Sequence, residues 1–217
     1  MSIRLALVTS LVAIFLIFAT KPVKADPTIG HVIILGDQST SMYPRIDEET
    51  TTLATLTDIV FQRVGITNAL REFTPWCNSV RATYIAWGEL QSQPISELVE
   101  PGKHFSDEFI AMIDDESDYP HGGTAHGAAL TEGIRQVSAT EPTALVFITN
   151  GAGKPVSNVD LTPVTVFKVS LFNEEVTEYL RDEFLPNEPH LVQAESAADV
   201  SLAVKAALQS VDTLCLG

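Results

Sequence analysis

Residues 32–41 read VIILGDQSTS, an apolar run followed at once by a turn rich in oxygen-bearing side chains. The apolar run indicates a buried β-strand, which we place at His31–Gly36. Asp37, Ser39 and Ser41 then occupy alternate positions of the turn. Short oxygen side chains in this pattern can converge on a hard cation such as Mg²⁺, which takes oxygen ligands. The same residue types cap helices and hold turns, so the motif alone leaves both interpretations open.

Apolar strand-like runs alternate with helical patterns along the rest of the chain. This alternation predicts an α/β fold with a mostly parallel sheet and helices on both faces. Further strands are expected at 80–87, 97–100, 144–148, 164–171 and 190–192. A first helix is expected at about 46–72, where Leu53, Leu56, Val60 and Val64 recur at helical spacing. A short helix should follow Ser106 as its cap, and another should cover 125–139. The last two are expected at 173–184, with Asn173 as cap, and after a capping box formed by Ser196 and Asp199.

Two later segments carry polar residues at matching places. His121-Gly122-Gly123-Thr124 precedes a helical pattern, and Thr149-Asn150-Gly151 follows the apolar strand 144–148. With the Asp-x-Ser-x-Ser turn, this ordered set resembles the von Willebrand factor type A (VWA) domain family over roughly residues 30–210. The resemblance implies a three-layer, doubly wound, Rossmann-like sheet. It also implies a metal-ion-dependent adhesion site formed by these three segments.

The resemblance further implies that Asp37, Ser39, Ser41 and Thr124 hold Mg²⁺ or Mn²⁺. In the family the third segment supplies an Asp, where this chain has Asn150. Asn keeps a carbonyl oxygen but brings no charge, and ligand charge is one factor that sets affinity for hard cations. We therefore count Asn150 among the expected ligands and expect weak cation binding, or none if the site has decayed.

The N-terminus has the form of a secretory signal peptide. Arg4 precedes an apolar run over residues 5–19, and Val23 and Ala25 stand at the small-residue positions before a cleavage point. The run is shorter than the roughly 20 residues of a membrane span. An uncleaved anchor is the alternative. We expect residues 1–25 to be removed, which leaves 26–217 as a single VWA-like domain, secreted or periplasmic and not inserted in a membrane.

The mature chain is strongly acidic. Loss of Arg4, Lys21 and Lys24 lowers Lys plus Arg from 13 to 10 against 28 Asp plus Glu, so the formal net charge changes from −15 to about −18. Such a surface repels nucleic acid and anionic lipid. Acidity alone names no partner, because it also serves solubility.

Two cysteines, Cys77 and Cys215, stand in a chain that is expected to reach an oxidising compartment. No Cys-x-x-Cys or Cys/His spacing indicates a zinc or redox motif. We expect a disulfide that ties the C-terminal tail to the segment after the first helix. Two unpaired thiols are the alternative.

The sequence offers little support for an enzyme. Phosphotransferases with an Asp nucleophile need a second acid two residues on, where this chain has Ser39, and no G-x-S-x-G, G-x-x-x-x-G-K-[ST] or H-E-x-x-H motif is present. We interpret His121 and His126 as exposed loop histidines, since imidazole suits zinc or copper better than Mg²⁺. Metal-assisted hydrolysis with His126 as base is the one enzymatic alternative.

The sequence therefore predicts an exported protein-binding module. In the family that it resembles, an acidic side chain of the partner protein completes the coordination of the metal. The alternative is a metal-independent interaction scaffold, in which Asp37 and Thr124 only hold turns by hydrogen bonds.

Overall fold

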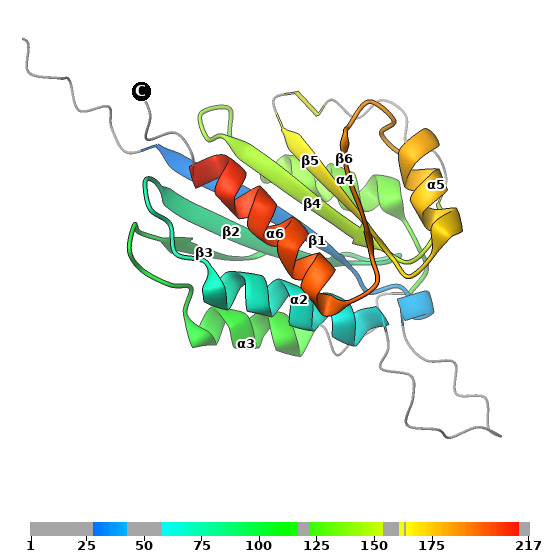
Figure 1. The fold of residues 1–217 in the computed structure, drawn as a ribbon, viewed down its shortest axis with the longest axis horizontal. Coiled ribbons are helices and arrows are strands. Elements are labelled where there is room, and N and C mark those ends of the chain that lie inside the picture. The colour runs from blue at the N-terminus through cyan, green and yellow to red at the C-terminus, as the bar shows by residue number, and fades with distance from the viewer. Residues whose placement is uncertain (1–27, 43–57, 117–121, 154–160, 163, 213–217) are drawn as a thin grey trace, which may run out of the picture.

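Six strands form one sheet in the order β3-β2-β1-β4-β5-β6 (Figure 1). The computed structural model describes residues 28–42, 58–116, 122–153, 161–162 and 164–212. All neighbouring strands are parallel except the antiparallel pair β2 and β3. The elements are β1 (Ile29–Asp37), η1 (Thr40–Met42), α2 (Asp58–Glu72), β2 (Ser79–Trp87), β3 (Ile95–Val99), α3 (Asp107–Glu116), α4 (His126–Arg135), β4 (Thr143–Thr149), β5 (Thr165–Leu171), α5 (Glu174–Asp182), β6 (His190–Ala194) and α6 (Ala197–Asp212).

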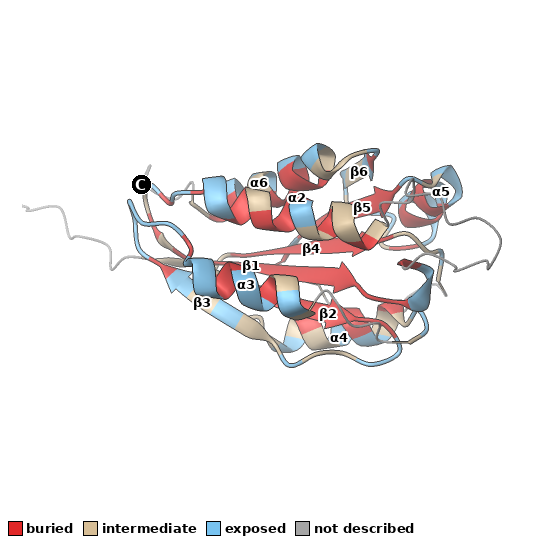
Figure 2. Ribbon diagram, turned by 90° about the horizontal axis from the view of Figure 1, so that it is seen from below, coloured by how far each residue is buried: buried red, intermediate tan, exposed pale blue. Residues whose placement is uncertain are grey.

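The helices cover both faces of the sheet, which confirms the predicted three-layer α/β class. Helices α2, α3 and α6 contribute side chains to the core on one face, and α4 and α5 to the core on the other. Figures 1 and 2 show α6 and α4 on opposite sides of the sheet. Strand β1 lies at the centre and is buried on both faces. Val32 and Ile34 pack in the core formed with α2, α3 and α6, whereas Ile33 and Leu35 pack in the core formed with α4 and α5. This two-sided burial explains why the strand reads as a continuous apolar run.

Helix α6 packs against α2, which in turn borders the site. The stripe of α6 that faces the core consists of Val200, Val204, Leu208 and Val211, which are all buried. A Cβ added at Gly65 of α2 would lie 2.5 Å from Val200 Cβ. Glycine at this position therefore allows the two helices to approach closely.

The predicted helix caps are present. Asn173 Oδ1 accepts the Glu175 and Val176 N–H groups at 2.9 and 3.4 Å. The Ser106 hydroxyl accepts the Phe109 N–H at 3.1 Å. Ser196 and Asp199 are joined by a 2.8 Å hydrogen bond at the start of α6. Capping residues could be read from the sequence because their partners are local backbone groups.

Several predicted boundaries and one helical face were wrong. Helix α4 ends at Arg135, not near residue 139, because the backbone tightens there and Gln136 N–H bonds to Gly133 O at 3.0 Å. Strand β3 spans Ile95–Val99 instead of 97–100, and β6 continues to Ala194. On α2, Val64 is 37% exposed, and the buried stripe runs through Ile59 and Ile66. The expected part of this helix before Asp58 lies outside the described residues.

The expected signal peptide, residues 1–25, also lies outside the described residues and stays a prediction. Within the described ranges, no helix is both long enough and apolar enough to cross a bilayer.

Candidate functional site

The candidate site lies at the C-terminal ends of β1 and β4, which are neighbours in the middle of the sheet. The chain leaves β1 for β2 on one side and later returns to β4 on the other side, so the strand order reverses at this point. Ligand sites of doubly wound sheets lie outside the carboxyl ends of strands at such a reversal. Asp37 is the last residue of β1, and Asn150 directly follows β4. The sheet thus brings these two residues to the same edge.

A continuous hydrogen-bonded chain joins the first and third motifs. Ser39 Oγ lies 2.8 Å from Ser41 Oγ, and Ser41 Oγ donates to Asn150 Oδ1 at 2.8 Å. Asn150 Nδ2 donates to the Ser41 carbonyl at 3.0 Å and to the Asp58 carboxylate at 2.6 Å. The structure therefore brings together Ser39, Ser41 and Asn150, which the sequence singled out, and adds Asp58, which it did not.

The loop that carries Thr124 is held against the first motif. Thr40 N–H donates to the Gly122 carbonyl at 2.8 Å. Gly122 has a φ of 85°, and a Cβ at this position would lie 3.0 Å from Glu89 Cβ. Glycine is therefore favoured both by the left-handed backbone and by the close approach of Glu89.

Thr124 itself is exposed and lies beside the third motif. A Cβ added at Gly151 would lie 3.6 Å from Thr124 Oγ1 and 4.0 Å from Ser41 Oγ. All three motifs thus meet at one place, with the Thr124 hydroxyl next to the turn that contains Asn150. His121, at the other end of the Thr124 loop, lies outside the described residues.

Asp37 is fully buried and its carboxylate is held from several sides. Thr149 Oγ1 donates to Oδ2 at 2.6 Å, and the Ser39 N–H donates to Oδ1 at 2.8 Å. Burial raises the pKa of Asp37, while the hydrogen bonds from Thr149, Ser39 and the Asn150 N–H act in the opposite direction. A positive charge beside a buried carboxylate favours its ionised form. A bound cation would therefore compensate for the lost contact with water.

Gln62 is a residue at the candidate site that sequence reasoning missed. It is fully buried on α2, where its Oε1 accepts the Asp37 N–H and its Nε2 donates to the Asp37 carbonyl, both at 3.0 Å. The side-chain amide thus pairs with both backbone groups of Asp37 and fixes the end of β1 on α2. One signal was available: Gln62 is a lone polar residue in the stripe formed by Ile59 and Ile66.

The expectation that His126 is an exposed loop histidine was wrong. His126 is the first residue of α4 and is only 2% exposed. Its Nδ1 lies 3.1 Å from the Tyr179 hydroxyl, and its Nε2 lies 3.5 Å from Thr149 Oγ1. The ring packs among the aromatic side chains of Trp87, Phe147, Tyr179 and Phe184. Burial lowers the pKa of His126 to about 4, so the imidazole is neutral near pH 7. His126 therefore lies next to the Thr149 hydroxyl, which donates its hydrogen bond to the Asp37 carboxylate.

The oxygens of the site lie about as close together as the ligands of one hard cation, and their 2.8 Å spacing is also that of ordinary O–H···O hydrogen bonds. Octahedral Mg²⁺ binds oxygens at about 2.1 Å, so adjacent ligand oxygens lie about 3 Å apart. Ser39 Oγ, Ser41 Oγ and Asn150 Oδ1 are already separated by successive distances of 2.8 Å. Among the described residues, no group of three or more His, Cys, Asp or Glu side chains is placed to hold a metal. The site instead gathers the neutral oxygens of Ser39, Ser41 and Asn150.

The first of the two cysteines lies beside the end of the last helix. Asp212, the last residue of α6, accepts the backbone N–H groups of Trp76, Cys77 and Asn78 at 2.8, 3.0 and 3.0 Å. Cys215 follows three residues later and lies outside the described residues. The disulfide stays a prediction, supported by this anchoring of Asp212 beside Cys77.

Comparison with known proteins gave matches at the level of structure only. No known family model matches the sequence, and neither does any curated protein sequence. Among solved structures, an aerotolerance-related membrane protein from Bacteroides fragilis, crystallised with multiple mutations to serines, has a TM-score of 0.54 and 13% identity. The match covers 83% of this chain and 99% of that chain.

Two other matches are longer proteins. The PilB minor pilin from Streptococcus sanguinis has a TM-score of 0.57 and 14% identity, over 89% of this chain and 63% of that chain. A von Willebrand factor type A structure from Catenulispora acidiphila has a TM-score of 0.52 and 13% identity, over 82% and 42%. The chain thus spans less than two thirds of either of these two structures. Together with the sheet order and the placement of the three motifs, these matches identify the fold of the protein as that of the von Willebrand factor type A domain.

Proposed function

We propose that the protein is an exported protein-binding module that engages its partner through a weakly bound divalent cation. Asp37, Ser39, Ser41 and Thr124 would hold the cation, with Asn150 in place of the usual carboxylate. The observation that carries the proposal is that the three motifs meet at the edge where the strand order reverses, with their oxygen-bearing side chains next to one another. Mn²⁺ and Mg²⁺ both accept such oxygen ligands.

A bound cation would supply positive charge and an open position for a carboxylate oxygen of the partner. The domain itself carries a formal charge of about −18 after signal cleavage, from 10 basic and 28 acidic residues. Its long-range field repels an acidic protein, but salt screens that field beyond roughly 8 Å, whereas a ligand bond acts at contact. The partner we propose is therefore basic overall and inserts one exposed Asp or Glu. The similar fold of a minor pilin supports an extracellular location.

A metal-independent scaffold is the second candidate, and one observation favours it. The side chains of the site already satisfy one another: Ser41 and Asn150 exchange hydrogen bonds, and both Asp37 oxygens accept hydrogen bonds. Fully paired polar groups hold a turn without further ligands. In this case the domain would bind its partner through the same edge but without a cation.

Titration of the purified mature chain with Mn²⁺, followed by the electron paramagnetic resonance signal of free Mn²⁺, separates the two candidates. We expect the wild type to bind one Mn²⁺ and Asp37→Ala to bind none. Asp107→Ala, which removes an exposed acid from the first turn of α3, should bind as the wild type does. A wild type that leaves all Mn²⁺ free would refute the cation site.

Capture of partners from a cell-envelope extract, with and without EDTA, extends the test to the partner. We expect the captured proteins to be lost in EDTA and with Asp37→Ala as bait. Recovery of the same proteins in both conditions would contradict the cation bridge and support the metal-independent scaffold.

A further inference from the structure

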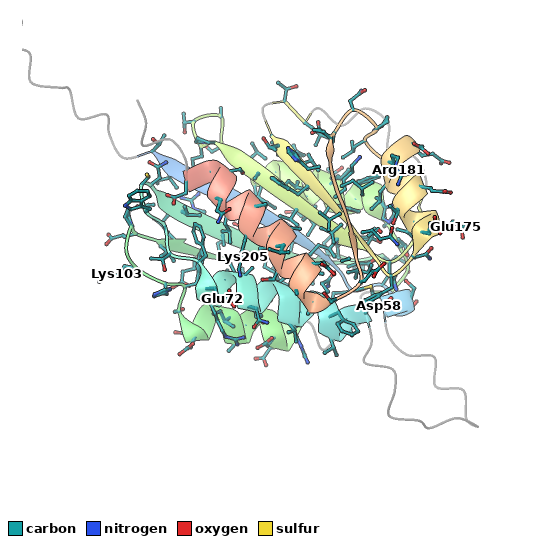
Figure 3. All side chains as sticks on the ribbon, viewed as in Figure 1. Asp58, Glu72, Lys103, Glu175, Arg181 and Lys205 are labelled. Carbon is teal, nitrogen blue, oxygen red and sulfur yellow. The ribbon has the colours of Figure 1, made fainter. Side chains whose placement is uncertain are left out.

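Asp58 brings a carboxylate to the site that none of the three motifs contains. It is the first residue of α2 and lies beside η1 at the C-terminal edge of the sheet (Figure 3). Its Oδ2 accepts a hydrogen bond from Asn150 Nδ2 at 2.6 Å. The Asp58 carboxylate is therefore hydrogen-bonded to Asn150, the residue that replaces the Asp of the family pattern.

This contact determines which way the Asn150 amide faces. Both N–H groups of Nδ2 are directed at acceptors, one at Asp58 Oδ2 and one at the Ser41 carbonyl oxygen. Rotation of the amide by 180° would place Oδ1 against these two oxygens, which is repulsive. Asp58 thus fixes Asn150 Oδ1 toward the Ser41 hydroxyl, the direction in which it can serve as a ligand.

We propose that Asp58 is a positioning residue that supplies the second negative charge of the cation site from behind Asn150. This inference rests on the proposed function. A carboxylate that accepts a hydrogen bond from a ligand polarises the ligand and fixes its orientation, and loss of such a partner typically lowers metal affinity about 10- to 100-fold. In this arrangement Asn150 provides the coordinating oxygen, and Asp58 provides the negative charge.

The proposal makes a distinctive claim about Asn150→Asp. In the wild-type background this change places two carboxylates at hydrogen-bonding distance, where like charges repel. The new carboxylate also loses the donor that held position 150 in place. We therefore expect Asn150→Asp alone to raise Mn²⁺ affinity little, although it restores the family pattern. In the Asp58→Asn background the amide and the acid exchange places, so the same change should restore the hydrogen bond between positions 58 and 150, while the donor to the Ser41 carbonyl stays lost. Part of the affinity should therefore return.

The test is a Mn²⁺ titration, by calorimetry or by the signal of free Mn²⁺, of the mature wild type and the variants Asp58→Asn, Asn150→Asp and the double variant. Asp107→Asn is the matched control, because it neutralises an exposed acid at the same place in another helix. We expect Asp58→Asn to weaken binding by about tenfold or more. We expect the double variant to bind more tightly than Asp58→Asn alone and Asp107→Asn to be unchanged. Asp58→Glu, which keeps the charge, should bind more tightly than Asp58→Asn.

The outcomes distinguish this inference from the proposed function. If the wild type binds Mn²⁺ and Asp58→Asn binds as tightly as Asp107→Asn, the role of Asp58 is refuted and the cation site stands. If the effects of the Asp58 and Asn150 changes are simply additive, the coupling between them is refuted. If neither the wild type nor any variant binds Mn²⁺, the cation site and the role of Asp58 both fail. Melting temperatures measured in EDTA establish that each variant is folded.

Discussion

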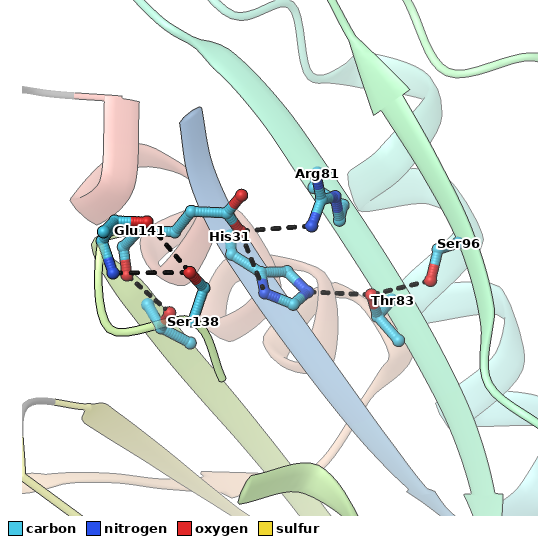
Figure 4. Close-up of polar contacts among 8 residues, drawn as sticks. His31, Arg81, Thr83, Ser96, Ser138 and Glu141 are labelled. Carbon is cyan, nitrogen blue, oxygen red and sulfur yellow. Dashed lines mark hydrogen bonds and ion pairs between the residues drawn. The ribbon is translucent and has the colours of Figure 1, made fainter. Parts of the chain in front are cut away.

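His31 lies in a buried polar cluster at the end of β1 opposite to Asp37 (Figure 4). Its Nε2 is 2.8 Å from Thr83 Oγ1, and its Nδ1 is 3.7 Å from Glu141 Oε2, too far for a hydrogen bond. Arg81 pairs with the same Glu141 oxygen at 3.2 Å. Burial and the positive charge of Arg81 lower the pKa of His31 to about 4. The imidazole is therefore neutral in the folded protein at pH 7.

Because His31 resists protonation only in the folded state, we expect acid to destabilise the protein through this residue. Between pH 6.5 and about 4 the unfolded chain binds the proton and the folded chain does not, so the free energy of unfolding falls as the pH falls. Since one pKa unit corresponds to about 1.4 kcal/mol, the lowered pKa of His31 accounts for up to roughly 3 kcal/mol of the free energy of unfolding. This stability is fully present above pH 6.5 and is lost as the pH falls toward 4. Urea unfolding of the wild type and of His31→Gln across this range measures the difference.

The difference between the two proteins isolates His31, since His126 is also buried and shifts in the same direction. His190→Gln, which removes an exposed histidine, is the control and should keep the wild-type pH dependence. An equal loss of stability in acid for the wild type and His31→Gln would contradict the prediction.

The junction between β1 and α2 depends on the Gln62 amide. Gln62→Leu fills the same space but leaves the Asp37 N–H and C=O groups buried and unpaired, which typically costs about 1–3 kcal/mol per group. We expect a lower melting temperature and weaker Mn²⁺ binding, because the backbone that presents the Asp37 carboxylate loosens. Gln209→Leu on the exposed side of α6 should change stability by less than about 0.5 kcal/mol. A Gln62→Leu protein as stable as Gln209→Leu would show that this amide pairing does not hold the junction.

The order and type of the elements could be predicted from the sequence, because apolar periodicity and caps are local signals. The three motifs could likewise be placed at one edge, since the carboxyl ends of the central strands meet there. Lys168 shows the limit of such reasoning. It is 1% exposed in β5, where its Nζ donates to the carbonyls of Leu180 and Leu185 at 2.7 and 2.9 Å at the end of α5. A charge in a buried strand could not be predicted without knowing which helix end would meet it.

The same limit explains what was missed in the site. Gln62 and Asp58 act on residues that are far away in the sequence, at positions 37 and 150. Neither belongs to a motif, and their role follows from the way α2 packs beside the strand ends. The predicted face of α2 was itself wrong at Val64, although Val60 packs against the core. Side chains that contact a site from another element therefore emerge only with the three-dimensional packing.

The molecule as a whole is predicted to be closed by a disulfide between Cys77 and Cys215. We expect thiol counting under denaturing, non-reducing conditions to find no free thiol in the mature protein. A bond that closes a loop of this length stabilises by roughly 4–5 kcal/mol at most. Reduction should therefore lower the melting temperature by several degrees. A Cys77→Ser, Cys215→Ser double variant should show no response to reductant, and two reactive thiols in the wild type would contradict the bond.

The start of β1 and the end of α6 lie at one edge of the sheet, and the candidate site lies at the opposite edge. Strand β1 begins beside Ser79 of β2, and α6 ends at the Trp76–Asn78 segment that leads into β2. Both therefore lie at the edge opposite to Asp37 (Figure 1). The nine residues of β1 separate the two edges by about 27 Å. Attachment of the protein at this end, by a linker or on a solid support, would therefore keep the anchor point about 27 Å away from the candidate site.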